Sequence, residues 1–104
     1  MLEVTDETFA AEVLDAGRPV VVDFWAPWCG PCKAVGKALE ELEAEHGERV
    51  GFVTVNIDDH PLNAAEHSVL SLPTVILFEG GTARETVVGA RPRSYFERSF
   101  APWL

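Results

Sequence analysis

The chain has 104 residues, of which 17 are acidic and 8 basic, giving a formal net charge of −9. Because 47% of the residues are hydrophobic, one domain over residues 1–104 can bury a core without disulfide staples. The negative charge argues against nucleic acid or an anionic membrane surface as a partner. The sequence contains no apolar run of about 18 residues, so we expect no membrane span.

The first four residues, Met-Leu-Glu-Val, show neither the basic start nor the apolar stretch of a secretory signal. A cytoplasmic location is therefore the default expectation, although a mature chain whose signal had been removed would read the same. The chain also has only two cysteines, whereas a small secreted domain usually has several that are spread along the sequence.

The N-terminal segment predicts a short edge strand followed by a helix. The strand covers Leu2–Val4, and Thr5 or Asp6 caps the helix, which Gly17 ends. On one side this helix carries the apolar side chains of Phe9, Val13 and Leu14.

Two stronger elements follow. Val20–Trp25 is an apolar run, β-branched at its start, and is typical of a strand buried on both faces. Pro31–His46 predicts a helix that Gly47 ends. Opposite a face rich in glutamates, this helix carries an apolar stripe of Val35, Ala38, Leu39 and Leu42.

The second half of the chain predicts three more strands, a short helix and a C-terminal helix. The strands are Val50–Ile57, Val75–Phe78 and Thr86–Val88, and the short helix is Leu62–His67. The glycines of the segment Glu79–Thr82 favour a hairpin turn between the last two strands. Pro92 opens the last helix, whose shared apolar face consists of Phe96, Phe100 and Trp103.

This order of elements predicts an α/β fold. We expect a central mixed five-stranded sheet, partly parallel with an antiparallel hairpin at its end, and flanked by helices on both faces. The segment Cys29-Gly30-Pro31-Cys32 then lies between the buried strand and the long helix.

Cys29 and Cys32 are the residues to which the sequence assigns chemistry. At the start of a helix the free backbone N–H groups and the helix dipole favour an anion, so the pKa of the Cys29 thiol should be lowered. Pro31 fits the first turn because its missing N–H has no helical partner there. Cys32, one turn further on the same side and more buried, can reach the sulfur of Cys29.

This arrangement predicts thiol–disulfide exchange. Cys29 attacks a target disulfide to form a mixed disulfide, and Cys32 then attacks Cys29 and releases the reduced target. A lower pKa increases the thiolate fraction but reduces its nucleophilicity, so the net gain in attack is only about threefold. The proximity of Cys32 and a surface that docks the target should therefore contribute more.

Two other interpretations of the cysteine pair are weaker. A zinc site needs two further ligands, but His46, His60 and His67 are not spaced for that role and there is no second C-x-x-C. We therefore expect no metal. A purely structural disulfide would close so small a loop that its stabilising effect would be slight.

Asp23 interrupts the buried strand. A buried, unpaired carboxylate is costly and usually stays protonated near neutral pH, and a raised pKa suits proton transfer. The alternative is a strand in which Asp23 faces solvent.

The segment Phe24–Lys33, with the sequence F-W-A-P-W-C-G-P-C-K, closely resembles the active-site segment of the thioredoxin family. The resemblance extends to Val20–Phe24, Asn56–Asp58, Leu72–Thr74, Gly80–Gly81 and Val88–Ala90. It implies a thioredoxin fold and a protein-disulfide reductase or electron carrier. W-C-G-P-C-K combined with a downstream L-P-T is much more specific than a lone C-x-x-C.

The resemblance implies roles for the matching residues of the cysteine segment and the buried strand. Cys29 corresponds to the nucleophile, Cys32 to the resolving thiol, and Asp23 to the buried carboxylate that handles the proton of Cys32. The Gly30–Pro31 dipeptide favours a reductant, since oxidising relatives usually carry a histidine between the cysteines.

The resemblance also implies a docking surface for the target. Pro73 corresponds to a cis-proline that keeps metals away and presents the backbone of Leu72 or Thr74 to the target. The residues alone also fit an ordinary trans proline. The rest of the docking surface would comprise Trp28, Gly89 and Ala90.

In the thioredoxin family the disulfide is reduced by a thioredoxin reductase, whose flavin and NADPH belong to that partner. The resemblance therefore implies no cofactor bound to this chain, disulfide-containing proteins as targets, and a monomer. A dedicated partner of one enzyme, such as a peroxidase, would still perform redox chemistry. A regulatory binding module, by contrast, would not need both thiols.

Three residues depart from the family pattern. Lys37, preceded by Gly36, stands where a helix-kinking proline is usual, so the long helix should be straighter or bend at Gly36. Thr54 stands where many members have a lysine, so Asp23 should stay neutral to a higher pH than in relatives. Leu72 replaces a more common β-branched residue, a change that should be tolerated.

Overall fold

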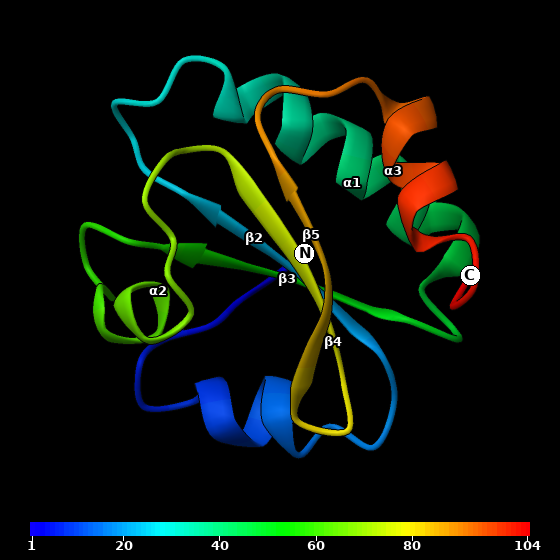
Figure 1. Cartoon of the computed structure of the whole chain (residues 1–104), viewed down its shortest axis with the longest axis horizontal. Coiled ribbons are helices and arrows are strands. Elements are labelled where there is room, and N and C mark those ends of the chain that lie inside the picture. Colours follow the sequence, from blue (N-terminus) through cyan, green and yellow to red (C-terminus); the bar gives the residue numbers. More distant parts are fainter.

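Five strands form a single mixed sheet at the centre of the computed structural model, which describes residues 1–104 (Figure 1). They are β1 (Leu2–Glu3), β2 (Val20–Trp25), β3 (Gly51–Asn56), β4 (Thr74–Glu79) and β5 (Thr82–Val88). The order across the sheet is β1-β3-β2-β4-β5. Strands β1, β3 and β2 are parallel, whereas β4 is antiparallel to both β2 and β5. The predicted mixed sheet with a hairpin at one end is confirmed.

Helices cover both faces of the sheet, as expected. One face is covered by η1, a stretch of π-helix at Ala10–Leu14, and by α2 (Leu62–Glu66). The other face is covered by α1 (Cys32–His46) and α3 (Arg93–Phe100), which lie side by side in Figure 1. None of these helices is long and apolar enough to cross a membrane.

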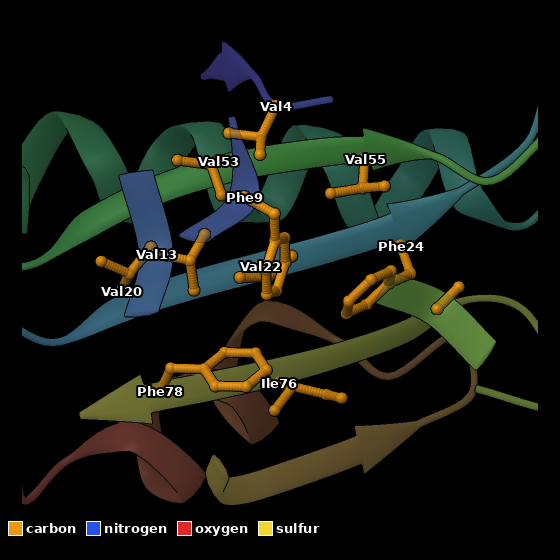
Figure 2. Packing of buried hydrophobic residues seen from close by; sticks show 11 residues of the cluster. Val4, Phe9, Val13, Val20, Val22, Phe24, Val53, Val55, Ile76 and Phe78 are labelled. Atoms are coloured by element: carbon orange, nitrogen blue, oxygen red, sulfur yellow. The ribbon is translucent and has the colours of Figure 1, made fainter. Parts of the chain in front are cut away.

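The central strand β2 is buried on both faces, and its bounds match the predicted run residue by residue. Its even-numbered residues, such as Val22 and Phe24, point to the η1 side, where they pack with Phe9 and Phe78 (Figure 2). Val21 points the other way, into the core beneath α1 and α3. Because side chains alternate along a strand, the one acidic residue of β2 also faces α1.

The first helix is shorter and less regular than predicted. Thr5 and Thr8 cap each other, since each hydroxyl oxygen accepts the backbone N–H of the other residue at 2.9 and 3.1 Å. Only the π-helical stretch Ala10–Leu14 follows this turn. Phe9 and Val13 are nevertheless buried against the sheet, as the apolar pattern predicted.

Asp6, the other predicted cap, has a different role. Its carboxylate accepts the backbone N–H groups of Leu62 and Asn63 at 3.2 Å, and so caps the start of α2 instead. Burial alone raises the pKa of Asp6, but the hydrogen bonds from Leu62 and Asn63 outweigh burial and lower the pKa below its usual value. The side chain therefore joins two segments that are 56 residues apart in sequence.

The prediction for β5 was too short, because the strand begins at Thr82 rather than Thr86. Gly80 and Gly81 form the hairpin turn with φ angles of 59° and 79°, which glycine adopts readily. From Thr82 to Thr86 every residue of this edge strand is exposed. An exposed edge lacks the apolar alternation from which a strand is normally recognised.

The bounds of the other strands and helices differ from the prediction by one residue at most, except at the end of α3. The long helix α1 begins at Cys32, one residue after the predicted start, and ends at His46 as predicted. Helix α3 follows Pro92 and ends at Phe100. Trp103 therefore lies beyond the helix, although its side chain packs against the same core as Phe100.

Ser68, directly after α2, has a φ of 58° and is the only residue other than glycine with a positive φ. The Val69 N–H donates to Ala64 O at 2.9 Å, the closing bond of a Schellman turn in which glycine is usual. A side chain in this left-handed conformation costs roughly 1–2 kcal/mol. We predict that Ser68→Gly raises the free energy of unfolding by about 1 kcal/mol, measured by urea denaturation.

A matched control for this prediction is Ser94→Gly, at an exposed position within α3. Glycine in a regular helix should lower the stability by about 0.5–1 kcal/mol. A loss of stability in Ser68→Gly of the same size as in the control would show that the turn is not strained at Ser68.

Candidate functional site

The two cysteines lie where the chain leaves β2 and enters α1, and they are joined by a disulfide with the Cα atoms 5.4 Å apart. The Cys29 N–H donates to Ala26 O at 3.0 Å, and the Cys32 N–H donates to Cys29 O at 3.3 Å. These turns place Cys29 just before the helix and Cys32 at its first residue. Cys29 is 6% exposed and Cys32 is 4% exposed, so Cys32 is the more buried by only a small margin.

Asp23 lies beneath the first turns of α1 and is only 2% exposed, so the alternative of an aspartate facing solvent is wrong. A methyl group added at Gly36 of α1 would lie 3.7 Å from Asp23 Oδ2, which shows how closely the helix passes. Asp23 Oδ1 is buried without a hydrogen-bond partner in the protein. Burial raises the pKa of Asp23 from 3.8 to about 7.

Thr54 is the cross-strand neighbour of Asp23 on β3. Its hydroxyl donates to the backbone carbonyl of Asp23 at 3.4 Å, not to the carboxyl group. No salt bridge reaches Asp23. The carboxyl group therefore has neither a cation nor a donor to offset its loss of hydration, in agreement with the raised pKa.

The predicted docking loop begins at the same end of the sheet as the cysteine segment. Thr74, the first residue of β4, pairs with Phe24 near the end of β2, and the Leu72–Pro73 peptide bond just before it is cis. The Pro73 carbonyl accepts the N–H of Gly89 at 2.9 Å. Gly89 has a φ of 102°, a conformation that side chains rarely allow. The predicted residues Leu72–Thr74 and Gly89–Ala90 are thus brought together.

Trp28 is 67% exposed, beside the disulfide. Its indole Nε1–H donates to Asp58 Oδ1 at 3.1 Å, and the Asp58 backbone N–H in turn donates to Asn56 Oδ1 at 3.0 Å. These bonds hold a large apolar side chain at the surface in a fixed orientation. Asp58 had no predicted role, since a contact across 30 residues leaves no local pattern.

A solvent-open pocket of about 350 Å³ lies between the end of β2 and the first turns of α1. Its wall includes both cysteines and Asp23. Trp25 also lines the pocket. Its indole Nε1, like Asp23 Oδ1, is buried without a protein partner. Nowhere does the structure gather three or more His, Cys, Asp or Glu side chains that could hold a metal ion.

Two cysteines form a disulfide at the start of a helix, and a buried carboxyl group lies next to them. This arrangement defines a thiol–disulfide oxidoreductase. The chain belongs to the thioredoxin family, because the family model for thioredoxin matches residues 1–101. The protein accordingly reduces disulfides by reversible dithiol–disulfide exchange through Cys29 and Cys32.

Individual relatives agree with this assignment. A thioredoxin of Streptomyces clavuligerus is 47% identical over 91 residues, which span 88% of this chain and 84% of that protein. Thioredoxin 1 of Nostoc sp. is 45% identical over 102 residues, or 98% of this chain and 95% of the relative. A bifunctional thioredoxin reductase/thioredoxin of Mycobacterium leprae is 43% identical over 96% of this chain, which spans 22% of that protein.

The raised pKa of Asp23 makes the stability of the oxidised protein depend on pH. The unfolded chain loses this proton near pH 3.8, whereas the folded protein keeps it to about pH 7. Between these values the unfolded state binds fewer protons, so stability falls as the pH rises, by roughly 4 kcal/mol in total. We predict that Asp23→Asn matches the wild type at pH 4 and exceeds its free energy of unfolding by several kcal/mol at pH 8.

Urea denaturation at both pH values checks this prediction. Asp15→Asn removes the same charge from an exposed position and controls for the general effect of a less acidic chain. An Asp23→Asn advantage that is equal at pH 4 and pH 8 would contradict the assignment of a neutral, buried carboxyl group.

Proposed function

We propose that this protein reduces disulfides in other proteins by a sequence in which Cys29 attacks and Cys32 resolves, with Asp23 as the proton acceptor of Cys32. The observation that supports the proposal most is the shared pocket, whose wall contains the disulfide and the buried carboxyl group of Asp23. A carboxyl group with a pKa of about 7 is divided between both protonation states at neutral pH, as an exchanging acid and base must be.

In the first step the Cys29 thiolate attacks one sulfur of the target disulfide. A bond forms between that sulfur and Cys29 Sγ, the target S–S bond breaks, and the other target sulfur leaves as a thiolate. In the second step Cys32 gives its proton to Asp23 and attacks Cys29 Sγ. The mixed disulfide breaks, the second target thiolate leaves, and the protein retains the Cys29–Cys32 disulfide. The two electrons lost by the protein reduce the target.

The target would dock on the surface around Trp28 and the cis-proline loop. Trp28 offers an exposed apolar face held by Asp58. The backbone of Leu72 and Thr74 beside Pro73 offers groups for main-chain hydrogen bonds, and Gly89 lets a target backbone approach closely. Ala90 extends this surface with a small exposed side chain.

The recharging partner in this proposal is a thioredoxin reductase, which supplies electrons from NADPH through its own flavin. A relative in which reductase and thioredoxin occur in one chain supports this pairing. The Gly30–Pro31 dipeptide favours a reductant over an oxidase. We also propose that the protein acts in the cytoplasm as a monomer, with no cofactor of its own.

The division of roles between the cysteines predicts opposite behaviour of two variants. Cys29→Ser should lower the rate of insulin reduction by dithiothreitol at least about a hundredfold, because the attacking thiolate is lost. Cys32→Ser should instead accumulate a mixed disulfide with insulin, because Cys29 is then not released by its neighbour. Intact-mass analysis of each variant with insulin, without reductant, checks both outcomes.

Ser71→Ala, a substitution at an exposed position near the docking loop, serves as a control and should behave like the wild type. A mixed disulfide in Cys29→Ser, and none in Cys32→Ser, would reverse the proposed roles. Full biological activity of the doubly substituted chain would favour a binding module over a reductant.

A further inference from the structure

The pocket beside the disulfide has a feature that reduction of protein targets does not use. Its wall contains Lys33 and Lys37, which are the two lysines of the chain. They are four residues apart on α1 and therefore lie on the same side of the helix. Both are exposed, and neither takes part in an ion pair. We name the space they border with the disulfide the lysine pocket.

The charge of the lysine pocket differs from that of the whole protein, whose net charge is −9. Apart from buried Asp23, the one acidic side chain in its wall is Glu40. Met1 also lines the pocket, but its amino group pairs with Glu43 at 3.3 Å. Two free ammonium groups beside the disulfide thus form a local positive field that attracts small anions.

The inner wall of the lysine pocket contains two polar atoms without a protein partner, the Trp25 indole N–H and Asp23 Oδ1, and both are buried. A small molecule with a carboxylate can pair with the exposed ammonium groups of Lys33 and Lys37. The volume of about 350 Å³ is at the lower end of the range for small-molecule sites.

We propose that the lysine pocket admits small disulfides that carry carboxylates, and that Lys33 and Lys37 select them over neutral or cationic disulfides. The proposal rests on the proposed function and concerns the selection among small disulfides by charge at the same cysteines. The wall of the pocket includes neither the loop Leu72–Thr74 nor Gly89. A small disulfide therefore has a route to the cysteines from the α1 side, apart from the surface proposed for protein targets.

The reaction with such a molecule is balanced by the chemistry already described. The Cys29 thiolate attacks one sulfur of the small disulfide, whose S–S bond breaks to release one small thiolate. Cys32 then forms the protein disulfide and releases the second. The protein dithiol loses two electrons, and the small disulfide becomes two thiols once each thiolate takes up a proton.

The test measures second-order rate constants for oxidation of the reduced protein by three disulfides of similar size. Dithiodipropionate carries two carboxylates, hydroxyethyl disulfide is neutral, and cystamine carries two ammonium groups. For the wild type we expect dithiodipropionate to react fastest and cystamine slowest. In the double variant Lys33→Gln, Lys37→Gln, the ratio of the dithiodipropionate to the hydroxyethyl disulfide rate should fall by about fivefold.

A matched control removes two positive charges far from the pocket, by Arg84→Gln on β5 and Arg98→Gln on α3. It should leave the ratio within about a factor of two of the wild type, since screening weakens distant charges. If both double variants lower the ratio equally, or if the wild type shows no preference for dithiodipropionate, the proposal is wrong.

Oxidation by insulin, measured on the same proteins, separates this proposal from the proposed function. The lysine variant should oxidise with insulin at nearly the wild-type rate. A fall in the insulin rate as large as that for dithiodipropionate would show that the lysines serve acidic side chains of protein targets, and would overturn the small-molecule assignment. Failure of the wild type with insulin would instead contradict the proposed function itself.

Discussion

The burial of one carboxyl group in the middle of the central strand is the constraint on which the site depends. Strand β2 is enclosed by β3 and β4 and covered on both faces, so each of its side chains enters one core or the other. Alternation sends Asp23 to the α1 side. An ionised group there would lose most of its hydration without gaining a partner, and its pKa is raised to about 7 as a result.

The same strand determines where the cysteines lie. The chain leaves β2 at Trp25, turns, and enters α1 at Cys32, so the disulfide lies at the end of the strand that carries Asp23. Helix α1 then covers Asp23 and passes it closely at Gly36. Thr54 on the neighbouring strand donates to the Asp23 backbone carbonyl and not to the carboxyl oxygens. Burial of Asp23 thus lowers the stability of the fold, and the same burial gives a carboxyl group that can exchange protons near neutral pH.

The sequence predicted the parts of the fold in which burial produces a local pattern. Strand β2 was predicted to the residue because its apolar run is continuous. Helix α1 was predicted to within one residue because its apolar stripe has the period of a helix. The exposed edge of β5 has no such pattern, so its first residues were missed. Asp6 was assigned to the wrong helix because its true partners lie 56 residues away.

The residues of the site were likewise predictable only in part. Cys29, Cys32 and Asp23 stood out from the residues themselves, whereas the cis isomer of Pro73 followed only from the family resemblance. The bond from Trp28 to Asp58 depends on how distant segments meet. No local rule relates such residues before the fold is known.

Asp23 is a buried carboxyl group that stays neutral in mild acid and ionises near neutral pH. The direct test is a carbon-13 NMR titration of the Asp23 carboxyl carbon in the oxidised protein, with the Asp23→Asn variant used to assign the signal. We expect a titration midpoint near pH 7. A midpoint near 3.8, the ordinary value for an aspartate, would contradict this expectation.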